Sequence, residues 1–256
     1  MKCLRKSKDS QAGFTLVELA IVMIIIGLLI GGILKGQELV ANARVTATVA
    51  QIKSLDGAMS TFVDKYNALP GDMNNSGNRL RGCTGNCATN SNGDGQIRTG
   101  NLGRNMAGGI EEYKAFLHLA AGDLISGVDP NRAVAPNGNS PLIVGDDLLA
   151  TEIGTNGHFR VGYTINGNAD GGLPNGTLRA GHYLSLASSA ATSVTNANAA
   201  YLTPTQASQI DFKLDDGVPT TGNVQPARTV QCIVGTAYNE AAAGAARCAL
   251  YVRVQG

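Results

Sequence analysis

Hydrophobic residues are concentrated in one run near the N-terminus, between Phe14 and Leu34. Glu18 is the only ionisable residue in this 21-residue segment. At ~1.5 Å per residue the run predicts a helix of roughly 31 Å, which matches the thickness of the hydrocarbon core of a bilayer. We therefore expect residues 14–34 to cross a membrane once.

A second apolar pattern follows the first. Apolar residues recur at intervals of three or four positions, and this spacing is typical of an amphipathic helix with one buried face. These residues are Val45, Val49, Ile52, Leu55, Met59, Phe62 and Tyr66. The pattern predicts one helix from Phe14 to Tyr66, with residues 35–66 packed on a globular domain. Leu69 precedes Pro70, which disfavours helical geometry, so the helix is expected to end before them.

Residues 67–256 are enough for one globular domain. A second, shorter helix is predicted over residues 111–125. Four stretches rich in β-branched and aromatic residues are predicted as strands, at residues 159–165, 183–186, 229–234 and 248–254. Helices followed by strands predict an α+β fold, with loops at residues 137–141 and 170–176.

Charge is distributed unevenly along the chain, whose formal net charge is +1. Residues 1–13 carry Lys2, Arg5, Lys6 and Lys8 against Asp9, a net +3, which leaves −2 for the other 243 residues. Positive residues beside a membrane span stay on the cytoplasmic side, so the bulk of the chain is expected outside, in the periplasm of a bacterium. No basic cluster alternates with aromatic residues, so no specific nucleic-acid partner is expected.

Glu18 argues against an ordinary secretory signal peptide, the alternative in which Ala41-Asn42-Ala43 is the cleavage site. The apolar run is longer than the ~7–15 residues usual in signal peptides, and such a peptide has no use for an acid. A carboxylate in hydrocarbon costs several kcal/mol unless it is neutralised or partnered. Glu18 therefore indicates a function within the membrane.

Residues 13–18 (Gly-Phe-Thr-Leu-Val-Glu), placed between a basic leader and an apolar run, resemble the cleavage and methylation signature of type IV prepilins and type II secretion pseudopilins. The resemblance implies that a prepilin peptidase removes residues 1–13 by cutting after Gly13, and that Phe14 becomes N-methylated. It also implies that Glu18 meets the Phe14 ammonium of a neighbouring, identical or related subunit. In a low dielectric, pairing offsets the free-energy cost of burying the carboxylate and that of burying the ammonium in one contact.

Subunits of this family lay the soluble half of a long N-terminal helix against an antiparallel β-sheet. The resemblance therefore implies the same α+β arrangement here, in a precursor that crosses the inner membrane once with a periplasmic domain. From there the subunit would enter a cell-surface pilus or a periplasmic pseudopilus. Both destinations stay open, as does a membrane-anchored calcium-binding module that never polymerises.

Cysteine usage is typical of an oxidising compartment. Cys3 would leave with the leader, and four cysteines remain: Cys83, Cys87, Cys232 and Cys248. An even number predicts disulfides, with three possible pairings. Proximity in sequence favours Cys83 with Cys87 and Cys232 with Cys248. Four zinc-binding thiolates are the alternative, but these spacings match the usual zinc motifs poorly.

Residues 90–97 (NSNGDGQI) carry oxygen-bearing side chains at alternate positions, followed by glycine, as calcium loops do. We expect Asn90, Asn92 and Asp94 to offer side-chain oxygens to Ca²⁺, and Gln96 its carbonyl. The twelfth position is Asn101 instead of a bidentate glutamate, so a more distant acid has to complete the site. The candidates are Glu111, Glu112, Asp215 and Asp216. A turn that binds no ion is the alternative.

The sequence contains no arrangement of residues that suggests catalysis. His118, His158 and His182 are isolated, and none has a metal-ligand spacing or lies beside a nucleophile motif. Residues 100–103 (GNLG) lack the lysine or the third glycine of phosphate-binding loops. We therefore expect a structural protein and not an enzyme.

Overall fold

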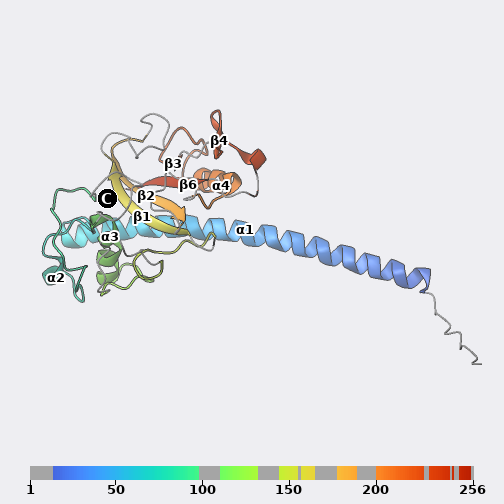
Figure 1. The fold of residues 1–256 in the computed structure, drawn as a ribbon, viewed down its shortest axis with the longest axis horizontal. Coiled ribbons are helices and arrows are strands. Elements are labelled where there is room, and N and C mark those ends of the chain that lie inside the picture. Colours follow the sequence, from blue (N-terminus) through green and yellow to red (C-terminus); the bar gives the residue numbers. More distant parts are fainter. Residues whose placement is uncertain are drawn as a thin grey trace, which may run out of the picture. The chain divides into compact units, whose positions relative to one another are not determined.

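The computed structural model describes residues 14–97, 110–131, 144–154, 157–164, 178–188, 200–227, 231–242, 244 and 248–254. The chain divides into two units, Met1–Ala43 and Arg44–Gly256. The elements, labelled in Figure 1, are α1 (Leu16–Tyr66), α2 (Ser76–Arg79), α3 (Ile110–Ala121), β1 (Gly157–Thr164), β2 (Gly181–Ser188), α4 (Pro204–Leu214), β3 (Val224–Ala227), β4 (Ile233–Val234), β5 (Ala237–Tyr238), η2 (Glu240–Ala242) and β6 (Ala249–Val254). A long apolar N-terminal helix and an antiparallel sheet make this an α+β fold, as the sequence predicts.

α1 joins the apolar run and the amphipathic segment in one 51-residue helix. Its buried residues lie on one stripe, as predicted from the spacing: Val45, Thr48, Val49, Ile52, Leu55, Ala58, Met59 and Phe62. Tyr66, the last predicted member, is partly buried against the same core. The helix ends at Tyr66 because Asn67 adopts a left-handed conformation with φ 47°.

Four antiparallel strands form the main sheet, in the order β1-β2-β6-β3. β1 and β2 pair along their whole length, from Gly157 opposite Ser188 to Thr164 opposite Gly181. The strands predicted at residues 159–165, 183–186 and 248–254 are thereby confirmed, although Ile165 lies outside the described residues.

The strand predicted at residues 229–234 is confirmed at Ile233–Val234 and wrong at residues 231–232, which form a turn, while residues 229–230 lie outside the described residues. Ile233–Val234 is β4 of a separate two-stranded sheet and not part of the main sheet. The fourth strand of the main sheet is β3, which comes earlier in the chain and contains Pro226. A proline in a strand is tolerated at a sheet edge, where β3 lies, but it hides the strand from pattern analysis.

The helix predicted over residues 111–125 is α3, which is shorter and ends at Ala121. Asp123 has a φ of 59°, and the Leu124 N–H bonds to the Leu119 carbonyl at 3.0 Å, which closes the helix end. The sequence pattern does not predict α2 or α4. α4 begins with a capping box, in which Thr203 and Gln206 each accept the other's backbone N–H.

One hydrophobic core joins these elements within Arg44–Gly256. The buried stripe of α1, the apolar face of α3 and the inner faces of the sheet contribute to it. Phe62 of α1, Phe116 of α3 and Phe159 of β1 are each at most 1% exposed. Figure 1 shows β1, β2 and α3 beside this half of α1. The loops predicted at residues 137–141 and 170–176 lie outside the described residues.

Candidate functional site

The N-terminus of α1 holds the described part of the predicted processing and assembly site. The backbone N–H and the hydroxyl of Thr15 both donate to Oε2 of Glu18, at 2.9 and 3.0 Å. The Glu18 N–H donates back to Thr15 Oγ1 at 3.3 Å. This reciprocal pattern is a capping box, which satisfies donors that the first helical turn leaves free. Phe14 is 82% exposed, and Gly13 lies outside the described residues.

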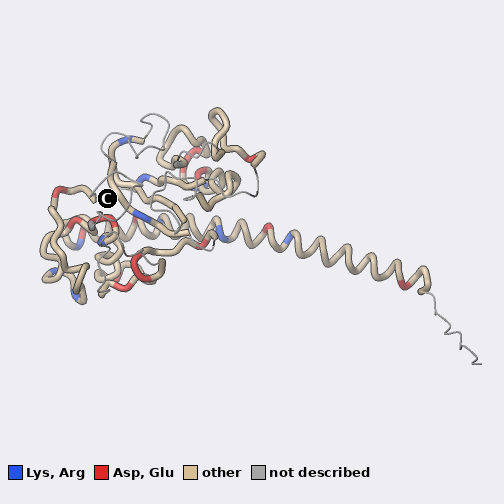
Figure 2. The backbone as a smooth tube through the Cα atoms, viewed as in Figure 1, with Lys and Arg blue, Asp and Glu red and all other residues tan. Residues whose placement is uncertain are grey.

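The apolar half of α1 exposes all its large hydrophobic side chains, with exposed fractions between 44% and 86%. They are Phe14, Leu16, Val17, Leu19, Ile21, Val22, Met23, Ile24, Ile25, Ile26, Leu28, Leu29, Ile30, Ile33, Leu34, Leu39 and Val40. Figure 2 shows how few charged residues interrupt this part of the helix. α1 is long and apolar enough to cross a membrane, by length and composition. Such a continuous apolar surface marks a membrane or protein interaction site.

Charged residues reappear directly after the apolar run. Lys35 Nζ and Glu38 Oε2 lie 2.7 Å apart, one helical turn from each other. Both side chains are exposed, so the pair contributes at most ~1 kcal/mol to stability. Its main consequence is that the apolar run at residues 14–34 is followed directly by two charged side chains.

Comparison with known proteins identifies this N-terminal region. Residues 8–34 match the protein family described as the prokaryotic N-terminal methylation motif. The chain therefore carries the prepilin-type signature, which confirms the resemblance found in the sequence. The motif supports a protein of the type IV pilin and pseudopilin class, with a structural role in place of an enzymatic one. No curated protein and no solved structure matches the chain.

Two disulfides are present, and they have the pairing that sequence proximity favours. Cys83 is bonded to Cys87, and Cys232 to Cys248. All four sulfur atoms therefore form covalent bonds, and none is a free thiolate for the zinc site considered as the alternative. The Cys232–Cys248 bond links the turn before β4 to the start of β6, and closing a loop of this length contributes ~3 kcal/mol.

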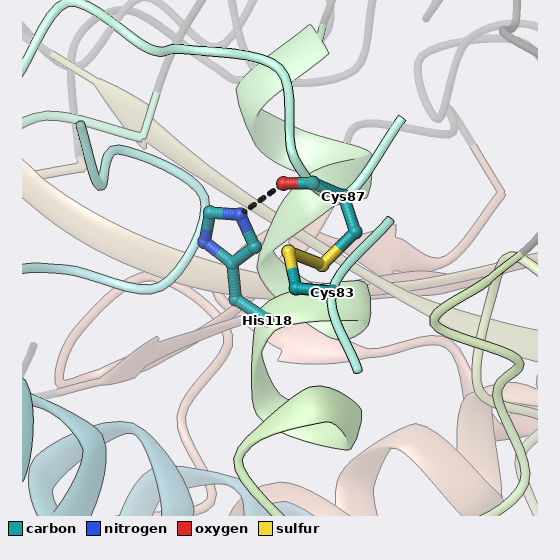
Figure 3. Close-up of side chains that lie close together, drawn as sticks. All are labelled: Cys83, Cys87 and His118. Atoms are coloured by element: carbon teal, nitrogen blue, oxygen red, sulfur yellow. Dashed lines mark hydrogen bonds between the residues drawn. A yellow bond between two sulfur atoms is a disulfide. The ribbon is translucent and has the colours of Figure 1, made fainter. Parts of the chain in front are cut away.

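His118 of α3 lies beside the Cys83–Cys87 disulfide (Figure 3). Its Nδ1 accepts the Gly71 N–H at 2.8 Å, so its Nε2 carries the proton and donates to the Cys87 carbonyl at 3.1 Å. The ring also stacks on Phe62, with 6.2 Å between centroids. Burial lowers the pKa of His118 to about 4. The neutral ring therefore links α3, the disulfide and the turn after α1, and both its nitrogens are occupied.

The other two histidines also hold parts of the fold together. His182 of β2 accepts the Ile97 N–H at 3.2 Å, and burial lowers its pKa to about 4. His158 of β1 accepts a hydrogen bond from Arg160 Nε at 2.9 Å. Desolvation lowers the pKa of that arginine. These contacts give each histidine a structural role.

The loop predicted to bind calcium makes hydrogen bonds through the oxygens expected to bind the ion. Asn90 Oδ1 accepts the Asn75 N–H at 3.1 Å. Asn92 Oδ1 and Asp94 Oδ1 accept N–H groups two residues further along the loop, at 3.2 and 2.9 Å. All three side chains belong to exposed residues. Calcium binding at this loop stays a prediction.

The structure brings one of the four distant acids to this loop. Glu111 Oε1 accepts the Asn92 N–H at 3.4 Å, whereas Asp215 and Asp216 accept hydrogen bonds from donors within residues 218–224. Glu112 is buried on α3. The twelfth position, Asn101, lies outside the described residues.

Two buried charges that the sequence analysis did not single out lie against the loop. Asp72 is 4% exposed, and Lys114 of α3 is fully buried. Lys114 lies one helical turn before His118 on a largely apolar helix. Because lysine is seldom buried without partners, this position is the sequence signal that could have identified Lys114. Asp72 follows a Pro-Gly turn and gives no such signal by itself.

Residues 215–223, which follow α4 and contain Asp216-Gly217 and Pro219, form bends and a turn. Asp216 accepts the Val218 N–H at 2.9 Å. Asp211 lies on α4 and accepts the Tyr238 hydroxyl at 2.8 Å, which ties α4 to β5. Burial raises the pKa of Asp211 to about 6, against the opposing effect of the Tyr238 hydrogen bond. The three carboxylates of Asp211, Asp215 and Asp216 lie within 4.8 Å of one another.

Proposed function

We propose that this protein is a structural subunit of a type IV pilus or a pilus-like filament, made as a prepilin. A membrane prepilin peptidase cuts after Gly13, and the new terminus at Phe14 is N-methylated. Residues 14–34 hold the precursor in the bacterial inner membrane, with residues 67–256 in the periplasm. The same helix then packs against the helices of identical or related subunits in the filament.

One observation carries this proposal: residues 14–34 have an exposed apolar surface, lie within the methylation motif at residues 8–34 and contain a single acid, Glu18. Apolar side chains of this kind need lipid or other helices around them. Association of helices from lipid depends on van der Waals packing and polar contacts, because lipid tails are as apolar as the side chains. A lone carboxylate near the helix start supplies such a polar contact.

Among the described residues, Glu18 accepts two hydrogen bonds at Oε2, from the backbone N–H and the hydroxyl of Thr15. Both donors are uncharged, so these hydrogen bonds do not neutralise its negative charge. Cleavage after Gly13 creates a positive charge at Phe14. Contact between this ammonium and the Glu18 carboxylate of the next subunit offsets the cost of keeping both charges in a low dielectric. The contact is head-to-tail, and such a contact generates an open fibre where the rotation between subunits does not close into a ring.

A type II secretion pseudopilin, whose filament drives protein export, is the second candidate. The methylation motif supports it equally, because pilins and pseudopilins share this signature. The two functions differ in what deletion of the gene removes. Loss of filaments from the cell surface supports the pilus, and loss of an exported protein from the medium supports the pseudopilus.

The test of polymerisation is Glu18→Gln, which removes the charge and keeps the shape. Glu38→Gln is the matched control, because Glu38 lies on the same helix in an exposed pair with Lys35. Each variant is expressed in the native host without the wild-type copy. Filaments are measured by immunoblot of sheared fractions and by electron microscopy, and membrane insertion by carbonate extraction.

We expect Glu18→Gln to insert normally but to lose at least ~10-fold of the filament yield, since unpairing a buried charge costs several kcal/mol. Glu38→Gln should assemble as the wild type does. Normal filaments from Glu18→Gln would contradict the proposed pairing. A wild-type protein that inserts but forms no filaments, even with its assembly genes overexpressed, would instead indicate a membrane-anchored module.

A further inference from the structure

The loop at residues 89–97 encloses an anion of its own chain. Asp72 accepts the Gly93 N–H at Oδ1 and the Gly95 N–H at Oδ2, both at 2.7 Å. Gly93 and Gly95 have φ values of 70° and 79°, and alternation of such residues turns backbone N–H groups toward one side. The loop therefore directs N–H donors at a carboxylate, whereas a calcium loop directs oxygens at a cation.

A cation of the chain lies against the other end of the same loop. Lys114 Nζ donates to the carbonyls of Thr89 and Asn90, at 2.9 and 3.3 Å, and to Ser91 Oγ at 2.7 Å. These three contacts use all the donors of an ammonium group. Because Lys114 is fully buried, the loop oxygens replace the water that would otherwise solvate it.

The charges around Lys114 favour its protonated form. Glu111 on the same helix and Asp72, which the loop contacts, both act on it with negative charge. Burial has the larger effect and lowers the pKa of Lys114 to about 8, so the ammonium still predominates at neutral pH. His118, one turn further along α3, is neutral there and adds no competing charge.

We propose that residues 89–97 are held in their conformation by the buried charges of Asp72 and Lys114, and not by a calcium ion. The predicted calcium ligands Asn90, Asn92 and Asp94 lie on the exposed side of the loop, while the two charges are buried. A calcium site needs six to eight oxygens around one point. The buried side of this loop offers three oxygens, which all accept from Lys114, and two N–H groups, which donate to Asp72.

The inference does not depend on polymerisation, since it concerns only contacts within the globular unit. Residues 89–97 should therefore keep their conformation whatever the calcium concentration outside the cell. Asp72 and Lys114 then hold the loop in place without a bound ion, and Asp94 only accepts hydrogen bonds within an exposed turn.

The test uses the full-length mature protein in detergent and compares Asp72→Asn with Asp94→Asn, which remove one carboxylate charge each from the inner and outer sides of the loop. Thermal unfolding is followed by tyrosine fluorescence, and hydrogen exchange by mass spectrometry of peptides covering residues 89–97. Both are measured in calcium chloride and in EGTA. Lys114→Met is the third variant.

Asp72→Asn and Lys114→Met should each lower the melting temperature by roughly 5 °C or more, and Asp94→Asn by no more than about 2 °C. Exchange in residues 89–97 of the wild type should be the same in calcium and in EGTA. Hydrogen exchange of the wild type tests the proposal even if a variant fails to fold. Because it is measured on residues 89–97 alone, it also separates this loop from any calcium effect at Asp211, Asp215 and Asp216. Slower exchange of the loop in calcium that Asp94→Asn abolishes would overturn the proposal, as would equal effects of Asp72→Asn and Asp94→Asn.

Discussion

The two halves of α1 show how one helix can carry two kinds of surface. Up to Val40 its large hydrophobic side chains are all exposed. From Val45 onward the buried residues form one stripe, and polar residues such as Lys53 lie off it. Apolar residues all round the helix therefore indicate a partner outside the chain, and a stripe indicates a partner within it.

The largest difference between the halves should appear when one apolar side chain is removed from each. Phe62→Ala leaves a cavity in the core and should lower the free energy of unfolding of the globular unit by about 3–5 kcal/mol. Leu29→Ala, at a residue 60% exposed, should change it by less than about 0.5 kcal/mol. Urea unfolding of the full-length protein in detergent, followed by tyrosine fluorescence, measures both.

Comparable losses from Phe62→Ala and Leu29→Ala would break the distinction, because they would mean that the apolar half packs against the globular unit. Leu29→Ala should instead act on filament yield, where neighbouring helices surround it. Measuring both variants for unfolding and for assembly separates the two roles of the helix.

Acid should unfold the packed half and leave the apolar half helical. The pKa values of His118 and His182 fall from about 6.5 to about 4 on folding, so the unfolded chain binds these protons first. The stabilisation that depends on the two neutral histidines is fully present above pH 6.5 and is lost as the pH falls toward 4. The loss in the free energy of unfolding is up to ~3 kcal/mol for each histidine. Asp211, whose pKa is raised to about 6, acts in the opposite direction over part of this range.

His118→Gln isolates one histidine from these opposing effects. The variant should lose less unfolding free energy than the wild type between pH 7 and pH 4.5, whatever its stability at pH 7. Urea titrations at the two pH values measure the difference. Equal losses in both proteins would show that protonation of His118 does not control acid unfolding.

Local patterns in the sequence predicted most of the fold. The stripe of α1, the strands β1, β2 and β6, and both disulfides depend on spacing or proximity along the chain. β3 was missed because Pro226 interrupts its pattern at a sheet edge. α4 was missed although Thr203 and Gln206 form a capping box that is readable as Thr-Pro-Thr-Gln. Its apolar positions are few, so the helical period is weak.

The candidate sites also differ in how much of each can be predicted from the sequence. Phe14, Glu18 and the methylation motif occupy one short segment, so the sequence shows them directly. Asp72 and Lys114 reach residues 89–97 only because folding brings them together from more than twenty positions away. The alternating oxygens of that loop were visible in the sequence, but the donors on its inner side were not, because φ values and long-range partners determine them.

The start of the mature chain is the most direct test of prepilin processing. Protein purified from membranes or filaments of the native bacterium should have the intact mass of residues 14–256 with one added methyl group, and fragmentation should place that methyl on Phe14. A chain that begins at Met1, or one cut after Ala43, would contradict processing at Gly13 and the polymerisation that depends on it.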